Sequence, residues 1–454
     1  MLLSHKTPPG PKGLPFLGSL LDMRRDIIKL LMDSTRDYGG IVKLKLGYDL
    51  AFLVSEPEFL KYVYLDHHKN FTKQTKAWKL FRLIFGEGLL TSEGELWRQQ
   101  RRLMQPSFHR ERIASLVKVM VNASAEMLKT WEEKNQVDVS AEMMRLTLRI
   151  VGETLLGINM SDQADVVAKT LPILLDQTIH QITKVVGLPL SFPSPRNLRF
   201  RKALKDMRGI GAKVIEERRH HPEKNADLLS MLMEARDEET GEKMSEEQLL
   251  DEVMTLFLAG HETTANALTW TCYLLSQHPD VEKKVREEVE HILRGHSPRF
   301  EDLPKLSYLE RVIKESLRLY PPVWFMGRLV MEDDEIGGYF VPAKSMIFLS
   351  PYITHHSRHL WEEPERFDPD RFLPERFSQK HRFAYTPFGA GPRQCIGNGF
   401  ALMEAQVILA MMLQKYRFQL VPGHRVEMDP IITLRAKYGM KMNLEKRGGS
   451  FIHC

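Results

Sequence analysis

The sequence has few cysteines and no long hydrophobic run. Three cysteines, Cys272, Cys395 and Cys454, occur in 454 residues, which excludes a disulfide framework and fits a reducing compartment. The N-terminus has too few apolar residues for a signal peptide, and no later stretch reaches the roughly 20 that a membrane-spanning helix needs. We therefore predict a soluble cytoplasmic protein with no membrane anchor.

Bulk composition excludes several further classes. Lys and Arg total 64 against 59 Asp and Glu, and a net charge of +5 over this length is too small to predict nucleic-acid binding. Hydrophobic residues form 43% of the chain and charged residues 27%. This much apolar side chain can bury a large core, which excludes a disordered chain and a coiled coil. We expect a monomer.

The apolar pattern predicts short strands and long helices. Alternating residues at 41–46, followed by 51–54, predict a β-hairpin, and 327–350 is a second β-rich region. Ser245-Glu246-Glu247-Gln248 is a capping box, and helical periodicity after it extends to His278-Pro279. This predicts a helix of roughly 30 residues, about 45 Å long at 1.5 Å per residue.

The order of these elements predicts the fold class. Strands lie near both ends of a helical middle, which favours a mainly α, α+β architecture over a doubly wound sheet. We expect the two strand regions to meet in space, so that residues 1–454 form one domain. Residues 1–13 are predicted to be a proline-rich lead-in and residues 446–454 a flexible tail.

One glycine-rich segment carries the strongest chemical signal. Phe388-Gly389-Ala390-Gly391-Pro392-Arg393-Gln394-Cys395-Ile396-Gly397 ends at the N-terminus of an apolar helix. A cysteine there faces unpaired backbone N–H groups and the positive end of the helix dipole, which lower its pKa. The glycines let a flat, bulky group approach the backbone. The residues alone leave open a buried structural cysteine or a nucleophile paired with a histidine, whereas zinc is excluded because no CxxC lies nearby.

This loop resembles the haem-binding loop of the cytochrome P450 family of haem-thiolate monooxygenases. The order Phe-x-x-Gly-x-Arg-x-Cys-x-Gly matches, and the resemblance runs from the proline-rich lead-in to about residue 445. It implies the cytochrome P450 fold, with a long helix crossing the distal haem face and the cysteine loop on the proximal face. It also implies haem b, with Cys395 as the axial ligand of the iron and Phe388 and Arg393 as further haem contacts. The type implied is bacterial, without a fused reductase.

Ala259-Gly260-His261-Glu262-Thr263-Thr264 interrupts the long apolar helix. Judged alone, these polar residues fit a solvated stripe, although a glycine there costs about 1 kcal/mol relative to Ala and a buried, unpaired carboxylate is expensive. The segment is similar to the family's oxygen-activation motif. The resemblance implies that Gly260 leaves room for dioxygen, that Thr263 hydrogen-bonds the activated oxygen, and that Glu262 is the acidic partner in proton delivery.

Two charged patterns resemble structural signatures of the family. Glu315-Ser316-Leu317-Arg318 places opposite charges on one helical face, which alone is ordinary surface decoration. It resembles the family's Glu-x-x-Arg signature, followed at the expected distance by Pro369-Asp370-Arg371-Phe372. The resemblance implies a structural network of Glu315, Arg318 and Arg371 beneath the haem loop.

Three residues are implied to bind the haem propionates. Trp97 and Arg101 stand four apart, so they share a helical face, and they resemble the family's Trp-x-x-x-Arg helix. Arg328, which follows Pro321-Pro322, matches a further propionate-binding arginine of the family, although its surrounding pattern also fits a structural arginine.

A basic stretch predicts a partner. Five arginines and one acid lie between Arg98 and Arg112, a pattern that fits either an ordinary solvated face or a patch that steers an acidic partner. In the family this helix lies on the cysteine side. The resemblance therefore implies docking of a ferredoxin, flavodoxin or flavin reductase that passes on electrons from NAD(P)H.

The resemblance also implies an apolar substrate pocket, although each of its residues alone fits core packing. Its predicted lining is Phe85, Ile179, Phe257, Ala259, Trp324, Phe325 and Met326. We expect a hydrophobic substrate such as a fatty acid, terpenoid or steroid. Ala-Gly-His-Glu-Thr-Thr also occurs in fatty-acid hydroxylases of the family, which slightly favours a fatty acid.

The implied reaction is hydroxylation or epoxidation with dioxygen and two electrons from a separate redox partner. Two alternatives stay open. A hydrogen-peroxide-using peroxygenase or isomerase is disfavoured because it does not need the pair Glu262-Thr263. A non-catalytic haem sensor or ligand carrier likewise has no use for such an acid–alcohol pair.

Overall fold

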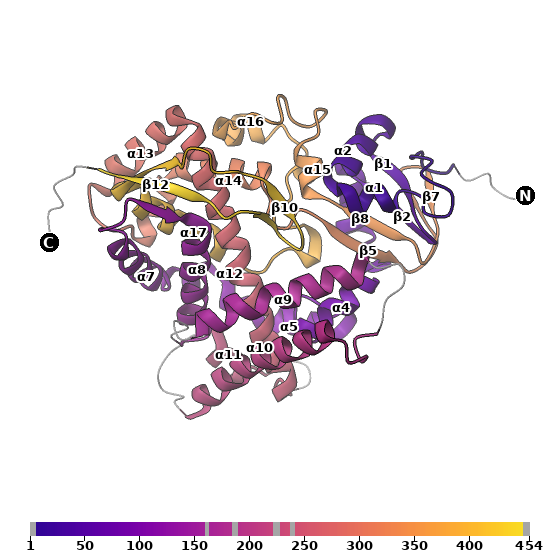
Figure 1. Cartoon of the computed structure of the whole chain (residues 1–454), viewed down its shortest axis with the longest axis horizontal. Helices are drawn as coiled ribbons and strands as arrows, with labels where there is room; N and C mark the ends of the chain where they lie inside the picture. The colour runs from indigo at the N-terminus through magenta and orange to yellow at the C-terminus, as the bar shows by residue number, and fades with distance from the viewer. Residues whose placement is uncertain (1–5, 159–162, 184–188, 221–227, 237–240, 448–454) are drawn as a thin grey trace, which may run out of the picture.

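The computed structural model describes residues 6–158, 163–183, 189–220, 228–236 and 241–447. Most of the predicted tail, 446–454, lies outside these residues. Helices make up most of the described chain (Figure 1). They are α1 Leu20–Arg25, α2 Ile27–Tyr38, α3 Pro57–Lys61, α4 Lys76–Phe85, α5 Gly94–Met104, α6 Arg110–Ala114, α7 Val117–Thr130, α8 Val139–Leu155, α9 Ala164–Thr183, α10 Pro195–His220, α11 Leu228–Glu234, α12 Glu246–Gln277, α13 Pro279–Leu293, α14 Ser307–Leu319, α15 Pro351–His355, α16 Pro374–Phe377 and α17 Asn398–Lys415.

The strands are short and form small sheets. They are β1 Ile41–Leu46, β2 Asp49–Val54, β3 Phe71–Thr72, β4 Gln136–Asp138, β5 Met326–Val330, β6 Asp334–Ile336, β7 Tyr339–Val341, β8 Met346–Leu349, β9 Tyr416–Leu420, β10 Met428–Pro430, β11 Leu434–Ala436 and β12 Lys441–Lys446. The largest sheet has the order β1-β2-β8-β5-β3. The hairpin β1–β2 is antiparallel, and β2 pairs in parallel with β8, so the two strand regions meet as expected.

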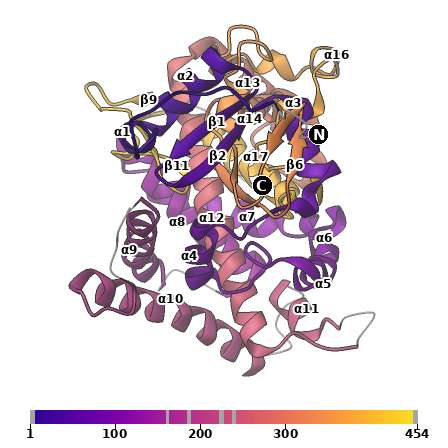
Figure 2. The same cartoon turned by 90° about the vertical axis from the view of Figure 1, so that its right-hand side faces the viewer.

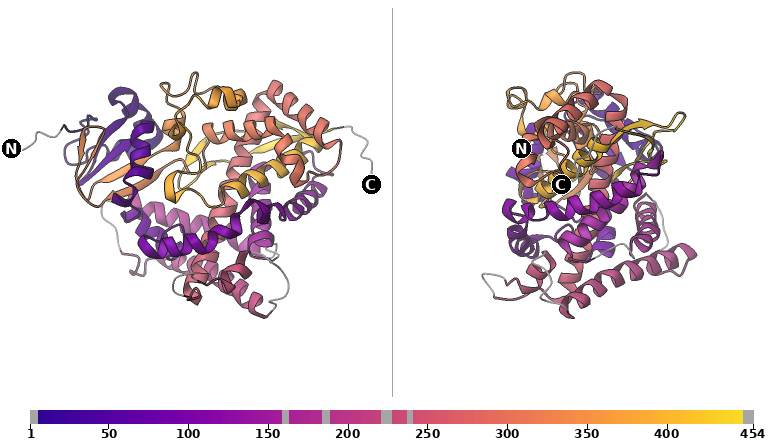
Figure 3. Two further views of the ribbon diagram at one scale, coloured as in Figure 1. Left: turned by 180° about the vertical axis from the view of Figure 1, so that it is seen from behind. Right: turned by 90° about the vertical axis from the view of Figure 1, so that its left-hand side faces the viewer.

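The sheet and the helices occupy different parts of the molecule. The large sheet lies at the right of Figure 1, with most helices to its left and below. Seen from the side in Figure 2, α9 and α10 lie below the sheet, and the left view of Figure 3 shows the sheet at one end of the molecule. The predicted mainly α, α+β class is therefore confirmed.

The long helix α12 is the central element. Its N-terminus has the predicted capping box: Ser245 Oγ accepts the Gln248 N–H at 3.2 Å, and Gln248 Oε1 accepts the Ser245 N–H at 3.0 Å. The helix packs along α8, and most of its residues are buried. No helix among the described residues has both the length and the apolar content needed to cross a bilayer.

Candidate active site

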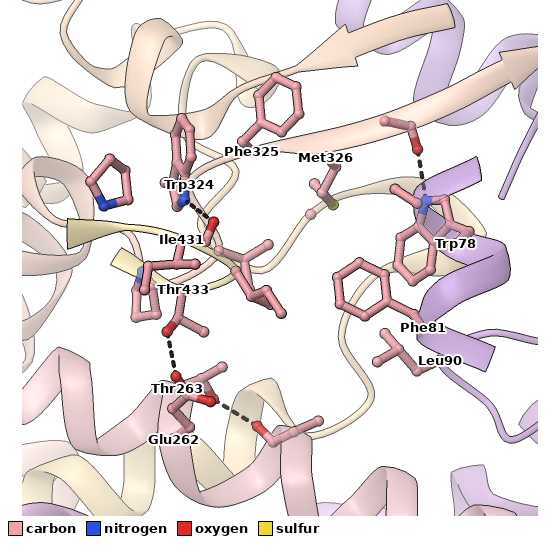
Figure 4. A pocket seen from close by; sticks show the side chains of 18 of the residues that line it. Trp78, Phe81, Leu90, Glu262, Thr263, Trp324, Phe325, Met326, Ile431 and Thr433 are labelled. Atoms are coloured by element: carbon pink, nitrogen blue, oxygen red, sulfur yellow. Dashed lines mark hydrogen bonds between the residues drawn. The ribbon is translucent and has the colours of Figure 1, made fainter. Parts of the chain in front are cut away.

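A cavity of about 1790 Å³ lies between α12, the loop before α17, and the turn joining β10 to β11. Ligand pockets usually measure about 300–1,000 Å³, so this one has room for more than one small molecule. Six of the seven predicted pocket residues line it, and several appear in Figure 4. They are Phe85, Ile179, Ala259, Trp324, Phe325 and Met326.

The prediction for Phe257 was wrong. Its side chain is buried in the helical core, 5.7 Å from the His261 ring between centroids, and it is not part of the cavity wall. Ala259, two residues later, does line the cavity. Phe257 packs into the helical core instead, although its neighbours Leu256 and Leu258 on α12 line the cavity.

Two parts of the cavity wall were not predicted. Ile431, Ile432 and Thr433 line the cavity from the β10–β11 turn, and Figure 4 shows Thr433 facing Glu262 of α12. Near the N-terminus, residues 16, 17, 20 and 23–29 and the β1–β2 turn also line it. Neither segment carries a recognisable motif, so only the fold brings them to the site.

The cysteine loop is held in shape by its backbone. Gly389 and Gly391 both have φ +67°, in the left-handed region, and a Cβ at Gly391 would overlap the Tyr64 carbonyl oxygen. The Cys395 N–H donates to the Phe388 carbonyl at 3.0 Å, which closes the loop. Arg101 Nη1 donates to the Gln394 carbonyl at 2.9 Å and so ties the loop to α5.

Cys395 exposes its side chain to the cavity. Apart from its face on the cavity, the side chain is enclosed by protein atoms, and this burial raises the pKa of the Cys395 thiol. The Gly397 N–H and the charge of Arg101 act in the opposite direction. The expected lowering of the Cys395 pKa was therefore wrong for the protein without a cofactor. The predicted backbone N–H contact at the helix N-terminus is present, but the effect of burial is larger.

Four cations gather beside this loop. Arg393 Nη2 pairs with Glu93 at 2.8 Å, and its guanidinium lies 4.0 Å from the Trp97 ring centroid. Arg101 and the buried Arg328 also face the cavity. The fourth is Lys73, which sequence reasoning missed; its Nζ donates to the Leu90 carbonyl at 2.6 Å.

The electrostatic neighbours of these cations include one carboxylate, Glu93. Burial, together with Arg328 and Arg393, holds the pKa of Lys73 well below its usual range. Burial likewise lowers the pKa of Arg393 to about 10, and its Nη1 is buried with no hydrogen-bond partner among the described residues. Such a positive excess is costly in a protein interior, so the cluster suits an anionic group.

The distal wall carries the acid and the alcohol. Glu262 and Thr263 both line the cavity, as the sequence predicted (Figure 4). The Thr263 hydroxyl donates to the Ala259 carbonyl at 2.8 Å. Glu262 is buried, and its Oε1 accepts a hydrogen bond from Thr433 Oγ1 at 2.6 Å.

Gly260 has a packing role that the motif did not suggest. A Cβ added to it would lie 3.0 Å from Val151 Cγ2 on α8, so the missing side chain lets two helices approach closely. Its backbone also lines the cavity. A Cβ at residue 260 would therefore meet α8, and the room for dioxygen that the motif implies stays a prediction.

The predicted structural network is assembled. Arg318 donates from Nε and Nη2 to the two carboxylate oxygens of Glu315 at 2.7 and 2.8 Å, and Arg371 Nε donates to Glu315 Oε1 at 3.2 Å. All three side chains are buried. Asp370 stands outside this network, 3.6 Å from Arg311.

Known proteins resemble the chain over nearly its whole length. The family model "Cytochrome P450" matches residues 8–442. Cyclooctatin synthase of Streptomyces melanosporofaciens is 37% identical, covering 95% of this chain and 94% of its own. Pentalenene oxygenase of Streptomyces avermitilis is 33% identical, covering 96% and 97%. A crystal structure of the cytochrome P450DA heme domain superposes with a TM-score of 0.88 at 26% identity, covering 98% of both chains.

The fold, the cysteine loop and the distal acid–alcohol pair define a haem-thiolate enzyme, and the comparisons agree. The chain belongs to the cytochrome P450 family. It is an enzyme of the cytochrome P450 monooxygenase type.

The family implies haem with a thiolate ligand, and the residues of the site fit this group. Cys395 faces the cavity with its sulfur available as the axial ligand. Haem carries two carboxylates, and the cation cluster has a positive excess together with an unpaired buried donor on Arg393. Lys73, Trp97, Arg101, Arg328 and Arg393 line the cavity near Cys395 and would hold the haem.

Proposed function

We propose that this enzyme hydroxylates or epoxidises a terpenoid, with dioxygen as the oxygen source. The observation that carries the proposal is the continuous cavity, which joins Cys395 to Glu262 and Thr263 and is otherwise walled mainly by apolar and aromatic side chains. Relatives named for cyclooctat-9-en-7-ol and pentalenene, both terpenoids, support the substrate class. They outweigh the slight preference for a fatty acid that one short motif suggested.

Each part of the cavity has a distinct task in this reaction. Haem, when bound through Cys395, supplies the oxygen-activating chemistry. Trp324, Phe325 and Met326 form an apolar wall that orients a hydrocarbon and excludes water. Glu262 holds and exchanges protons at its carboxyl oxygens, and Thr263 offers a hydroxyl beside it on the same helix.

The first test asks whether haem is bound through sulfur. The haem-loaded protein is reduced under carbon monoxide, and its Soret maximum should lie near the wavelength from which the cytochrome P450 family takes its name. Cys395→Ser should remove this band. A chain that takes up no haem, or one with an unchanged band in the variant, would overturn the assignment of Cys395.

The second test asks for the substrate class. The enzyme is supplied with NADPH, a ferredoxin and its reductase, and either pentalenene, cyclooctat-9-en-7-ol or lauric acid, and products are identified by mass spectrometry. We expect a product 16 mass units heavier from at least one terpenoid, since one oxygen atom is added, and little from lauric acid. Turnover of lauric acid alone would contradict the proposal. Turnover with hydrogen peroxide but none with the electron-transfer proteins would favour the peroxygenase alternative.

We further propose that an acidic ferredoxin or flavodoxin docks on α5 and α6. Of the five predicted arginines, Arg98, Arg110 and Arg112 are exposed, whereas Arg101 turns inward to the cysteine loop. The exposed three therefore define the docking patch, on the same side of the chain as the loop that carries Cys395. A docked carrier would reach the thiolate side of the cofactor through this loop.

A further inference from the structure

Thr433 is the buried neighbour of the catalytic carboxyl. Its hydroxyl donates to Glu262 Oε1 at 2.6 Å, and both side chains line the cavity (Figure 4). The two residues stand 171 positions apart in the sequence. Thr433 lies in the turn between β10 and β11, and no motif of the sequence marks it.

The Thr433 hydroxyl makes two hydrogen bonds, one to each of two side chains on α12. Asn266 Nδ2, one helical turn along from Glu262, donates to Thr433 Oγ1 at 3.2 Å. A threonine hydroxyl carries a single hydrogen, and its oxygen is already accepting from the amide. That hydrogen is directed at Glu262 Oε1, so Asn266 and Thr433 together hold one carboxylate oxygen in place.

The turn that carries Thr433 is anchored on both sides. Trp270 Nε1 of α12 donates to the Leu434 carbonyl at 2.9 Å, and the Leu434 N–H donates to the Pro322 carbonyl at 2.9 Å. On its other flank, Ile431 accepts the Trp324 Nε1–H at 3.2 Å. The hydroxyl is thus presented by a turn held against α12, and Ile431 itself also lines the cavity.

We propose that Thr433 is a positioning residue for the proposed monooxygenase reaction: it holds the Glu262 carboxyl at the cavity wall, ready to exchange protons beside Thr263. Because the same turn lines the cavity through Ile431 and Ile432, a substrate that presses on the turn also bears on the carboxyl. This inference rests on the proposed function for its catalytic consequence, but not for its geometry.

Crystal structures of haem-loaded variants test the geometry directly. Thr433→Val keeps the shape of the side chain and removes the hydroxyl, whereas Thr433→Ser keeps the hydroxyl. We expect the Glu262 carboxyl to stay in place in the serine variant and to turn away from residue 433 in the valine variant. An unmoved carboxyl in Thr433→Val would overturn the proposal, whether or not the enzyme oxidises any probe.

A double-mutant cycle tests the catalytic consequence, with pentalenene as the probe and product formed per NADPH as the readout. Thr433→Val should lower this ratio by about tenfold, part of the 10²–10⁴ that a positioned proton donor contributes. In a Glu262→Gln background the same substitution should have no further effect, and Thr433→Ser should restore most of the ratio. Multiplicative effects of the two substitutions would show that Thr433 acts independently of Glu262, and would reject the proposal.

Thr147→Val is the matched control. The Thr147 hydroxyl also bonds to α12, donating to the His261 carbonyl at 3.0 Å, but Thr147 is not in the cavity wall. Its replacement should leave product per NADPH unchanged. If the wild-type enzyme converts none of the probes, the proposed function fails, while the crystal structures still decide the role of Thr433.

Discussion

Arg318 and His355 bond to each other reciprocally. Arg318 Nη1 donates to the His355 carbonyl at 2.8 Å, and His355 Nδ1 donates to the Arg318 carbonyl at 3.1 Å. His355 Nε2 accepts the Thr386 N–H at 3.0 Å, so the ring is neutral with its proton on Nδ1. Burial, reinforced by Arg318, holds the pKa of His355 well below its usual range. The pair joins α14 and α15 to the segment that leads into the cysteine loop.

Removing Arg318 should be strongly destabilising. Arg318→Ala would leave Glu315 buried with Arg371 as its remaining cationic partner, and breaking a buried pair typically costs about 3–5 kcal/mol. Arg318→Lys should not restore this loss, because one ammonium group cannot reproduce the fork that binds both carboxylate oxygens. The check is the urea midpoint of the haem-loaded protein.

Arg366→Ala provides the control for that measurement. Arg366 pairs through its side chain with Glu363 at 3.0 Å, and both side chains are about two-thirds exposed, at 66% and 65%. Exposed pairs contribute about 0–1 kcal/mol, so the midpoint should move little. Equal losses in Arg318→Ala and Arg366→Ala would show that the buried network does not stabilise the fold.

Gly391→Ala should disrupt the cysteine loop. Residue 391 has φ +67°, and a Cβ there would overlap the Tyr64 carbonyl oxygen. The variant should bind less haem per chain, measured from the Soret absorbance, and unfold at a lower temperature. Gly423→Ala has a similar φ of +77° with nothing within 4 Å of the new Cβ, so it should show only the strain of about 1–2 kcal/mol and normal haem content. Full haem occupancy in both would contradict this account of the loop.

The sequence predicted those parts of the fold that local patterns determine. The capping box at Ser245 fixed the start of α12, and alternation at 41–54 gave the hairpin β1–β2. The strand order β1-β2-β8-β5-β3 could not be predicted from the sequence. Strands β2 and β8 are nearly 300 residues apart, and their parallel pairing depends on how the intervening helices pack.

Those site residues that belong to a short, recognisable sequence motif could be predicted. Cys395 and Glu262 stand in motifs that identify them, and both line the cavity. Phe257 was misplaced because the side of α12 that faces the cavity is set by tertiary packing. Lys73 and Thr433 were missed because each is an isolated polar residue, brought to the site only by the folded chain.

Glu252 should make stability depend on pH. It is buried on α12, where Oε2 accepts the Leu89 N–H at 2.9 Å, and burial raises its pKa from 4.5 to about 8. Between these two pH values the folded chain binds more protons at this carboxyl than the unfolded chain does. The free energy of unfolding therefore falls as pH rises through that window, by about 1.4 kcal/mol for each unit of pKa difference.

Glu252→Gln should remove this dependence. Urea midpoints of the variant and of wild type are measured at pH 5 and at pH 8.5. The midpoint of the variant, relative to that of wild type, should be higher at pH 8.5 than at pH 5. Glu247→Gln, exposed in the first turn of the same helix, serves as the control and should show no such difference. A Glu252→Gln variant that tracks wild type at both pH values would mean that this carboxyl is already ionised in the folded chain at pH 5.

Reversing the charge of the proposed docking patch should slow electron delivery. Arg98→Glu, Arg110→Glu and Arg112→Glu together replace three exposed cations on α5 and α6. Reduction by an acidic ferredoxin, followed by stopped-flow absorbance at low salt, should slow by about 10–100-fold, because electrostatic steering raises association rates by 10–10³.

The salt dependence separates steering from a general defect. Wild-type reduction should slow as ionic strength rises and the Debye length falls below about 10 Å, whereas the variant should show little or no such slowing. The control reverses Arg201, Lys202 and Lys205, which are exposed on α10, away from α5 in Figure 2. This change alters net charge equally but leaves the patch intact, so reduction should stay near the wild-type rate. If both triple variants slowed alike, net charge rather than a docking site on α5 and α6 would govern the encounter.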